Sequence, residues 1–410
     1  MADPSVLILT PEPPWPLHGG GAFRIASLLH YFARQADVDL ILFSEAGRSA
    51  VLPAGLVRSQ KVIPLPVHDK SPVSRYLRNA RRAVRGVPPL IDRLAGFSGE
   101  LSALLAGSHY DVGIVEHFWA APYLPQIARA CEKTVLDLHN IESVLHARSA
   151  ATSSGLIAAG HLRFADRGRA FEADLLPRYS LVLTTSEPDA ATAQQIAPTA
   201  RVAVYPNALP AAEVPAVEEE PVVVFAGNFE YHPNIDAVAW LVSAVWPEVR
   251  RQCPALRLRL VGRGREYIRH LLPSGLEIET TGPVEDARSE IARARIVIAP
   301  LRSGSGTRIK ILEAWAAARP VVATSLAAEG LKCRDNEDIL IANTPQEFGT
   351  SIARLNADPS RRAELAIRGR RLFEARYTWP AAWKILDLLP LIPGTGTGHR
   401  YTEEADANRR

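Results

Sequence analysis

Residues 296–324 constrain the fold of this chain more than any other segment. Residues 296–299 form a short β-branched and apolar run closed by Pro300, the pattern of a strand that is buried on both faces of a parallel sheet. A glycine-rich loop follows, and apolar residues then recur at helical spacing until Pro320 ends the pattern. Residues 321–323 are again apolar and mostly β-branched. The segment therefore predicts strand, loop, helix and strand, which is the βαβ unit of an α/β fold.

The loop that opens this helix is a candidate anion site. The first N–H groups of a helix lack partners inside the helix, and the helix dipole is positive at that end. Gly304 and Gly306 allow the main chain to approach a ligand, and Arg308 and Lys310 add positive charge suited to a diphosphate. Glu313, about one turn further on, offers a carboxylate to two hydroxyls of a ribose. A solvated first turn in which the glycines only make a bend is the alternative.

The run from Gly306 to Ala314 resembles the donor-nucleotide segment of retaining glycosyltransferases of the GT-B fold, in glycosyltransferase family 4 of the group 1 type. The family motif contains two glutamates separated by seven residues, and Glu313 matches the second one, which binds the ribose. Ser305 stands at the position of the first glutamate, which contacts the donor sugar. The resemblance implies that Ser305, Gly306, Thr307 and Glu313 line the donor site. This version of the motif is similar to a subgroup of bacterial sugar transferases linked to polysaccharide assembly.

The chain alternates strands and helices twice, and its 410 residues suit two domains. The resemblance implies an α/β fold of the GT-B type, with two doubly wound Rossmann-like domains that face an interdomain cleft. We place the N-terminal, acceptor-side domain at residues 1–208, a linker at 209–221, where periodicity is lost, and the donor domain at 222–378. Residues 379–389 are expected to form a helix that crosses back to the first domain, and residues 390–410 a disordered tail.

Three consecutive glycines follow the first predicted strand and its proline-rich loop. A glycine loop between the first strand and the first helix is where an α/β domain admits a ligand, although a flexible turn would use the same residues. The resemblance implies that this loop closes on the donor phosphate and the acceptor. Gly20 and Gly21 are therefore candidate substrate-binding residues, and His18 is a further one.

His139 follows a predicted strand at residues 134–138, at the strand end where ligands of open α/β sheets bind. Residues 137–143 resemble an Asp-x-His-Asn-x-Glu-Ser element of the same transferases, and the resemblance implies that His139 faces the donor sugar. We therefore expect His139 in the catalytic pocket, with Glu116 and His117 at the end of the preceding strand as a second contribution. A histidine that only caps the next helix is the alternative.

The second domain departs from the family at the positions that usually hold the diphosphate. Related enzymes have an arginine soon after the strand equivalent to residues 222–226 and a lysine several residues later, whereas this chain has Asn228 and Pro233. We hypothesise that Arg308 and Lys310 supply the positive charge instead and are catalytic with His139, because they would stabilise the leaving group. Asn228 would contribute a hydrogen bond to the substrate.

Two further loops are expected to line the nucleotide. Gly262 and Arg263 follow a predicted strand at residues 256–261 and match the Val-Gly-x-Gly loop of the family, which lines the nucleotide pocket. Val284 lies in a loop expected to place backbone groups against the base. Glu329, which follows the strand at residues 321–323, is interpreted as a helix cap and not as a ligand.

Residues 71–85 carry arginines at three- and four-residue spacing, which places most of them on one side of a helix. One interpretation is a solvated basic face. The other is a surface that docks onto anionic lipid headgroups or a lipid-diphosphate acceptor, which would give peripheral contact at the inner face of the membrane. The arginines concerned are Arg75, Arg78, Arg81, Arg82 and Arg85.

Composition excludes several other classes of protein. A net charge of +3, without an aromatic and basic stripe, argues against nucleic acid as a partner. Cys131, Cys253 and Cys333 lack disulfide or zinc-ligand spacing, so a reducing cytoplasm is expected. The start of the chain is not typical of a signal peptide, and no run reaches the ~18 apolar residues of a spanning helix. Without an Asp-x-Asp pair after a strand, we expect no metal and no cofactor beyond the donor.

The sequence therefore predicts a retaining glycosyltransferase of the hexosyltransferase type. It would transfer a sugar from a nucleotide-diphosphate sugar to a hydroxyl of a sugar, lipid-linked or small-molecule acceptor, in exopolysaccharide or other glycoconjugate synthesis. Two alternatives remain open. A nucleotide-sugar epimerase of the same fold would need acidic residues in the cleft, for which Glu116 and Glu142 are available. A non-catalytic nucleotide-sugar-binding module is compatible with Ser305 in place of the first motif glutamate.

Overall fold

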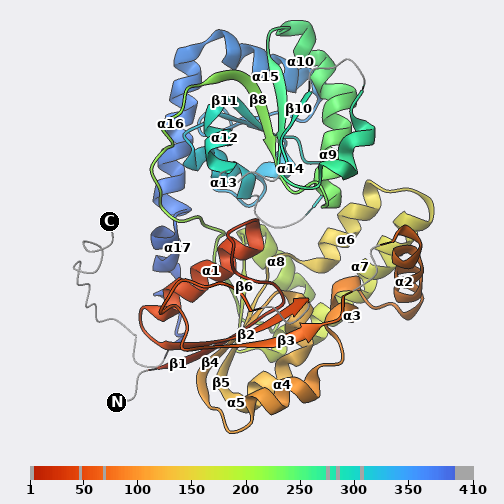
Figure 1. Ribbon diagram of the computed structural model, residues 1–410, viewed down its shortest axis with the longest axis vertical. Coiled ribbons are helices and arrows are strands. Elements are labelled where there is room, and N and C mark those ends of the chain that lie inside the picture. The colour runs from red at the N-terminus through yellow and green to blue at the C-terminus, as the bar shows by residue number, and fades with distance from the viewer. Residues whose placement is uncertain are drawn as a thin grey trace.

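The protein consists of two α/β domains, each built on a parallel sheet with helices on both faces (Figure 1). The structure is a computed structural model, and it describes residues 4–45, 49–67, 71–273, 278–282, 287–304 and 309–392. Two doubly wound domains that face each other confirm the predicted fold class. Among the described residues, none of the helices combines the length and the hydropathy of a membrane-spanning segment.

The first domain contains a seven-stranded sheet in the order β3-β2-β1-β4-β5-β6-β7. All of its pairings are parallel, with Val6 of β1 opposite Val38 of β2 on one side and Val112 of β4 on the other. Its strands are β1 (Ser5–Thr10), β2 (Asp37–Glu45), β3 (Ser59–Leu65), β4 (Tyr110–Glu116), β5 (Cys131–Asp137), β6 (Leu181–Thr184) and β7 (Val202–Val204).

Helices cover both faces of this sheet, and its central strands are therefore buried on both sides. Residues 6–10 of β1, for example, are fully buried. The described helices of the first domain are α1 (Gly20–Ala33), α2 (Pro72–Arg85), α3 (Pro89–Leu94), α4 (Ser98–Leu105), α5 (Leu124–Ala130), α6 (Glu142–Ala151), α7 (Gly155–Leu175) and α8 (Glu187–Ile196), with 3₁₀ turns at Phe118–Tyr123 and Leu176–Arg178.

The second domain repeats the arrangement with a six-stranded parallel sheet in the order β10-β9-β8-β11-β12-β13. Its strands are β8 (Glu220–Ala226), β9 (Arg257–Val261), β10 (Ile278–Thr280), β11 (Ala294–Ala299), β12 (Val321–Ala323) and β13 (Leu340–Ile341). Its described helices are α9 (His232–Trp240), α10 (Trp246–Gln252), α11 (Arg265–Ile268), α12 (Ala287–Arg293), α13 (Ile309–Ala316), α14 (Ser325–Ala328), α15 (Pro345–Ala357) and α16 (Pro359–Arg376), with a π turn at Leu241–Val245 and a 3₁₀ turn at Arg269–Leu271.

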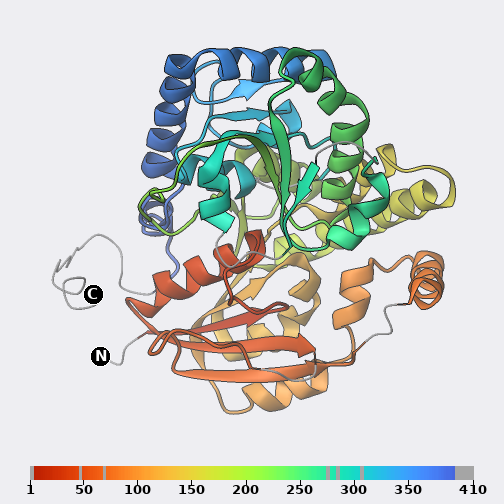
Figure 2. The same ribbon diagram turned by 45° about the horizontal axis from the view of Figure 1, so that its top comes forward.

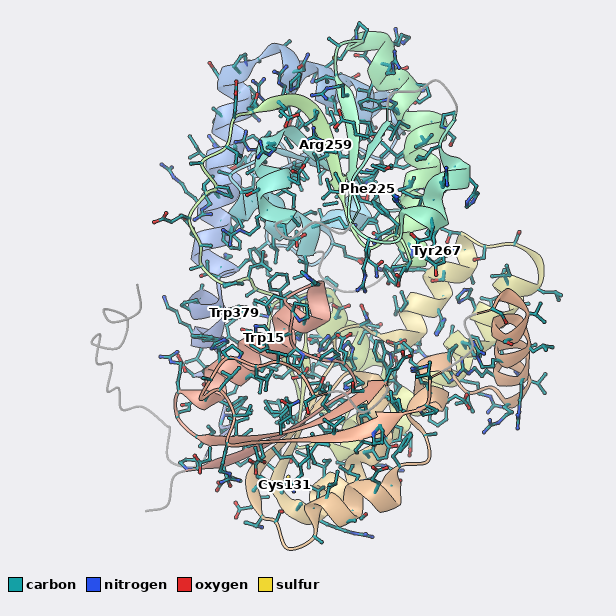
Figure 3. The ribbon with its side chains drawn as sticks, in the orientation of Figure 1. Trp15, Cys131, Phe225, Arg259, Tyr267 and Trp379 are labelled. Atoms are coloured by element: carbon teal, nitrogen blue, oxygen red, sulfur yellow. The ribbon has the colours of Figure 1, made fainter. Side chains whose placement is uncertain are left out.

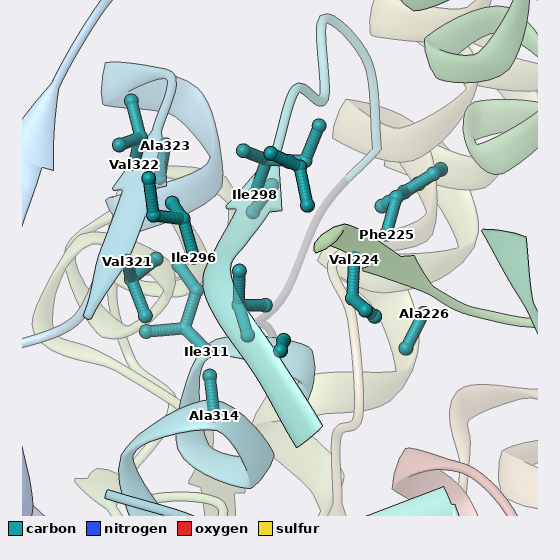
Figure 4. Packing of buried hydrophobic residues seen from close by; sticks show 14 of the residues in the cluster. Val224, Phe225, Ala226, Ile296, Ile298, Ile311, Ala314, Val321, Val322 and Ala323 are labelled. Carbon is teal, nitrogen blue, oxygen red and sulfur yellow. The ribbon is translucent and has the colours of Figure 1, made fainter. Parts of the chain in front are cut away.

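The βαβ unit predicted from residues 296–324 forms the centre of the second domain. Side chains of β8, β11 and β12 pack against Ile311 and Ala314 of α13 in one hydrophobic core (Figure 4). Trp315 of the same helix is fully buried. Because α13 rests on β11 along this apolar face, its first turn is held at the carboxyl end of that strand, which faces the first domain.

The chain crosses between the domains at two adjacent segments. Leu209 accepts a hydrogen bond from the Trp379 N–H and donates one to the Tyr377 carbonyl oxygen, both at 2.9 Å. Helix α17 (Trp379–Leu386) then packs on the first domain, where Trp379 lies near Trp15 beside α1 (Figure 3). These paired backbone bonds hold the two crossings side by side at one end of the interdomain contact.

The C-terminal segment differs from the expectation of a disordered tail from residue 390. Lys133 donates to the Pro390 carbonyl oxygen at 2.7 Å, and Leu391 and Ile392 are buried against the first domain. The prediction failed because the apolar residues at 391 and 392 extend the buried face of the preceding helix. The rest of that tail, residues 393–410, lies outside the described residues.

Candidate functional site

The carboxyl ends of the central strands of both sheets face the space between the domains. A Cβ built on Gly20, at the start of α1, would lie 3.1 Å from a side-chain carbon of Ile309, at the start of α13. Ligands of open α/β sheets bind at these strand ends. The glycine loop of the first domain and the predicted donor helix of the second therefore meet at one place.

An ion pair also joins the domains at this place. The Arg148 guanidinium of α6 donates to both carboxylate oxygens of Glu329, at 2.6 and 2.9 Å, and to the Gly304 carbonyl oxygen at 3.1 Å. Glu329 occupies the C-cap position of α14, as its interpretation as a helix cap suggested. Its carboxylate, however, serves the contact between the domains.

His139 sits in a buried network at the ends of β4 and β5. Its Nε2 lies 2.9 Å from Glu116 Oε2 and 3.5 Å from Asp137 Oδ2. Asp137 in turn accepts two hydrogen bonds from Arg24 of α1, at 2.5 and 2.7 Å. Because α1, β4 and β5 each contribute to this network, the His139 ring is held by the sheet itself and not only by its loop.

The environment of this network fixes its protonation states. Burial, reinforced by the neighbouring His117, lowers the pKa of His139 to about 4. Burial alone would raise the pKa of Asp137, but the Arg24 guanidinium holds it below the usual range. Burial and the nearby Asp137 raise the pKa of Glu116 well above its ordinary value. His139 is therefore a neutral hydrogen-bonding group at neutral pH, next to a Glu116 carboxyl that its surroundings disfavour as an anion.

A second histidine, His117, lies between His139 and Trp119 and stacks on the tryptophan ring. The His117 ring lies 3.5 Å from the His139 ring and 4.1 Å from the Trp119 ring, centroid to centroid, and its Nε2 lies 3.0 Å from Glu12 Oε1. Burial would raise the pKa of Glu12, but the bond to His117 lowers it below the ordinary value. A Cβ on Gly21 would lie 1.6 Å from the Glu12 carboxylate, so this glycine makes room for the pair.

Both carboxylates considered for an epimerase are buried and bonded within the first domain. Glu142 Oε1 accepts a hydrogen bond from Trp119 Nε1 at 2.9 Å, and burial raises its pKa to about 7. Glu116 is fully buried beside His139. Both carboxylates therefore take part in the buried hydrogen-bond network beneath the candidate site.

In the second domain, Lys310 and Glu313 lie on the first turns of α13. Lys310 Nζ donates to Asn234 Oδ1 at 2.7 Å and lies 4.4 Å from the centre of the Phe225 ring. A Cβ on Gly227 would lie 3.3 Å from Lys310 Nζ, so the ammonium is close to the loop after β8. Burial raises the pKa of the Glu313 carboxyl.

The loops after β8 and β9 are in contact at two glycines, Gly227 and Gly262. Gly262 has φ of +139°, and a Cβ there would lie 2.0 Å from the Gly227 carbonyl oxygen. Asn228 Oδ1 accepts from the Glu230 N–H at 3.0 Å, so its amide shapes its own loop. The side chain of Arg263 is exposed, and its charge helps to lower the pKa of Glu12 in the other domain. Asn228, Gly262 and Arg263 therefore lie on neighbouring loops, on the side facing the first domain.

Several predicted site residues cannot be placed. Ser305, Gly306, Thr307, Arg308 and Val284 lie outside the described residues. The segment that carries the first four is bounded by Gly304, which contacts Arg148, and by the start of α13. His18 is exposed in the loop before α1. Where the two domains meet, the structure brings together predicted residues of both: Gly20, Gly21 and His139 of the first, and Asn228, Gly262, Arg263, Lys310 and Glu313 of the second.

Sequence reasoning missed Arg24, Glu12 and Asn234. Arg24 is a single cation on the apolar face of a predicted helix, and such a residue signals a buried partner. Glu12 lies in a proline-rich loop whose path the sequence does not determine. Asn234 and Lys310 lie in the first turns of α9 and α13 and are 76 residues apart in the sequence, so their contact depends on how these two helices are placed on the sheet.

Two groups of described side chains are close enough to hold a metal ion. One consists of Glu12, His117 and His139, and the other of Glu116, Asp137 and His139. The second is poorly suited to a cation, because the Arg24 guanidinium already pairs with Asp137 and burial raises the pKa of Glu116, which disfavours its anionic form. The first is satisfied by its own hydrogen bond between Glu12 and His117. The expectation that the reaction needs no metal ion remains a prediction.

Comparison with known proteins relates the second domain to one family and the whole chain to one fold. Residues 220–358 match the family model described as "Glycosyl transferases group 1". An "Uncharacterized 44.6 kDa protein in cps region" of Klebsiella pneumoniae is 26% identical over 163 residues, which are 38% of this chain. The matched region spans 42% of the length of that relative.

Solved structures match over nearly the full length. Sucrose-phosphate synthase from Thermosynechococcus elongatus superimposes with a TM-score of 0.71 at 16% identity, covering 94% of this chain and 98% of that one. HepE of Anabaena, in complex with UDP and glucose, has a TM-score of 0.62 at 16% identity over 93% and 98%. Trehalose-6-phosphate synthase OtsA of E. coli has a TM-score of 0.63 at 14% identity over 93% and 98%. These similarities establish the fold.

Proposed function

We propose that the protein is a retaining glycosyltransferase, because residues 220–358 match the model of the group 1 glycosyl transferases and the whole chain has the GT-B fold. It transfers a hexosyl group from a nucleotide-diphosphate sugar to a hydroxyl acceptor. A uridine diphosphate donor is the first choice, because structural neighbours are described in complex with UDP or UDP-sugars. Polysaccharide synthesis is supported by the relative from a cps region.

The observation that carries this proposal is the meeting of α1 and α13 at the cleft. Gly20 approaches Ile309 from the opposite domain, which brings the His139 network to the same side as Lys310 and Glu313. A donor held by the second domain would therefore extend its sugar toward polar groups of the first. Transfer between two substrates requires such a two-sided site, whereas a one-domain binding module does not.

Lys310 would act on the leaving group. Its ammonium lies over the Phe225 ring and close to Gly227, which follows β8, and the diphosphate would bind beside it. Negative charge grows on the diphosphate as the bond to the sugar breaks, so a fixed cation stabilises the transition state more than the ground state. Arg308 would add a second charge. Glu313 would accept hydrogen bonds from the ribose hydroxyls in its ionised form, although burial raises its pKa.

His139 would position the donor sugar. Its pKa of about 4 keeps it neutral, so it can exchange a hydrogen bond with a sugar hydroxyl without adding positive charge near the reacting carbon. Glu116 and Asp137 orient the ring, and Arg24 orients Asp137. No described residue is assigned as a covalent nucleophile. The acceptor hydroxyl would attack from the face that the diphosphate leaves, and the diphosphate would accept its proton.

Calorimetry with a panel of nucleoside diphosphates and their sugars tests the donor site. One nucleotide should bind selectively to the wild type, and Glu313→Ala should weaken its binding at least about ten-fold, the effect of losing a hydrogen-bonded carboxylate. Glu364→Ala, on an exposed position of α16, is the matched control and should bind normally. If no nucleotide binds, or if both variants behave alike, the proposal fails.

Analysis of products then separates the possible reactions. Incubation of the selected donor with a sugar acceptor, followed by NMR of the anomeric proton, should show a new glycosidic bond with the configuration of the donor. An inverted bond would refute retention. A free epimerised sugar would indicate an epimerase, and an unchanged donor with every acceptor class would leave a binding module.

A further inference from the structure

Helix α2 exposes a row of apolar side chains to solvent. Val73, Leu77 and Val84 have exposed fractions of 69%, 62% and 78%, and Ala80 is also exposed. Their spacing of four, three and four residues places them on one stripe of the helix. Isolated exposed apolar residues are normal, but a full stripe along a helix is typical of a surface that is covered by something else.

The start of α7 extends this apolar region. Leu156 and Ile157, in the first turn of α7, are 81% and 65% exposed. Arg163 of the same helix donates to the Val84 carbonyl oxygen at 3.1 Å, which joins α7 to the end of α2. In both ribbon views, α2 and the α6–α7 hairpin lie at the same edge of the first domain (Figures 1 and 2).

Arginines flank the apolar stripe. Helix α2 contains no acidic residue, and a hollow of about 330 Å³ beside it is lined by five arginines and one aspartate. Within the described ranges, the carboxylates that pair with these cations are Asp92, which pairs with Arg82 and Arg85, and Glu45, which pairs with Arg93. Positive charge therefore remains in excess. The arginines that line the hollow are Arg78, Arg81, Arg82, Arg85 and Arg93.

We propose that this α2–α7 surface docks the protein on an anionic lipid bilayer. The surface consists of Val73, Leu77, Ala80 and Val84 of α2, Leu156 and Ile157 of α7, and the five arginines of the hollow. An apolar stripe bordered by cations is the pattern of a helix that lies in the membrane interface, with its apolar face among the acyl chains and its arginines at the phosphates. A polar protein partner would match the arginines but would not cover the stripe.

Docking in this way would place the candidate site close to the membrane. Helix α6 begins three residues after His139 and leads to the α6–α7 tip, and its ten residues span about 15 Å. A hydroxyl acceptor carried on a lipid would thus be presented at the side of the first domain. Membrane docking does not depend on the proposed function, because the residues that support it lie on α2 and α7 and beside them, away from the candidate site.

Vesicle flotation tests the proposal with the full-length protein. The wild type should float with phosphatidylcholine vesicles that contain phosphatidylglycerol, float less in high salt, and float weakly with phosphatidylcholine alone. Leu77→Asp/Val84→Asp should reduce the bound fraction more than about ten-fold, because two apolar side chains are lost from the interface. Arg78→Gln/Arg81→Gln should reduce binding to the anionic vesicles about five-fold per charge and remove much of the salt dependence.

Ile367→Asp on α16 is the control. The Ile367 side chain is 52% exposed on the other domain, so this variant should float like the wild type.

Circular dichroism and nucleotide binding establish that each variant is folded. Failure of the wild type to float, or equal flotation of all variants, would overturn the proposal. If the aspartate variants instead abolish self-association in solution without any vesicle binding, the surface is a protein interface and the membrane proposal is wrong. A donor that fails to bind while the protein still floats would refute only the transferase.

Discussion

Replacement of Arg24 by methionine should destabilise the first domain strongly. Arg24 is 1% exposed and Asp137 is 0% exposed, and their pairing includes two hydrogen bonds. Arg24 also donates to the Tyr205 carbonyl oxygen at 2.7 Å and to Asn207 Oδ1 at 3.0 Å, so it connects α1 with the ends of β5 and β7. Methionine fills a similar volume but leaves the Asp137 carboxylate buried without its cation.

Removal of one partner of a buried ion pair costs about 3–5 kcal/mol. A domain of this size loses roughly 2–4 °C of melting temperature per kcal/mol, so the first-domain transition should fall by about 6–20 °C. The matched control is Arg178→Met, which breaks an exposed pair with Asp174 on the same domain and should cost less than about 1 kcal/mol.

The pH dependence provides an independent check. Arg24 holds the pKa of Asp137 below its ordinary value of 3.8, so the pair contributes its full stability above that pH and loses it as the pH falls through the folded-state pKa. The difference between the wild type and Arg24→Met should therefore be largest near neutrality and shrink in acid.

Two measurements test this prediction. Urea unfolding, monitored by tryptophan fluorescence, gives the free energy of unfolding, and thermal unfolding gives the melting temperature of the first domain. Activity adds a second readout, since the variant should lose the orientation of His139 even where it remains folded. Arg24→Met/Asp137→Leu should recover stability without recovering activity, because the uncompensated charge is gone while the anchor for His139 is not restored. Stability of the single variant within about 1 kcal/mol of the wild type would refute the reasoning.

Three further predictions concern other parts of the chain. Gly262→Ala should cost about 1–3 kcal/mol and abolish nucleotide binding in calorimetry, because its Cβ meets a main-chain oxygen at 2.0 Å, whereas Gly282→Ala has open space and should be neutral; normal binding by the first variant would contradict this. Glu329→Gln should weaken the link to Arg148, a partly solvated pair worth about 1 kcal/mol or less, and widen the cleft as measured by X-ray scattering; an unchanged radius of gyration would count against a closing role. Burial lowers the pKa of His146 from 6.5 to about 4, so the folded state resists protonation and stability falls as the pH drops from 6.5 toward 4; denaturation curves of His146→Phe should show a weaker fall, and an equal slope would disprove the assignment.

Local patterns in the sequence determined most of the architecture. The strand at residues 296–299 and the helix after it were predictable because a β-branched run and a helical apolar stripe differ in period, and the structure has β11 at Ala294–Ala299 and α13 at Ile309–Ala316. Helix α7 begins at Gly155 and lies beside α6, although Gly155 and Gly160 weaken the helical pattern of its first turns in the sequence. Strand β13 has only two residues and was missed, since so short a segment has no period.

The site was less predictable, because its contacts join distant segments. His139 was identified by its place after a strand and by resemblance, but its partner Asp137 is anchored by Arg24, 113 residues away. Glu12 reaches His117 across 105 residues through a loop without periodicity. Such pairings depend on how the strands are ordered in the sheet, and a pattern read along the chain contains no record of that order.

The return of α17 to the first domain has a consequence for how the chain folds as it is synthesised. The second domain is continuous from β8 to α16, so it can complete its core as soon as those residues have emerged from the ribosome. The first domain is made earlier but must wait, because the apolar layer against α1 includes side chains from the end of the chain. The first of the two domains is therefore the last to complete its core, and until then the apolar face of α1 is exposed to solvent, where chaperones can bind it and where it can aggregate. The late side chains are Trp379, Ala382, Leu386, Leu391 and Ile392.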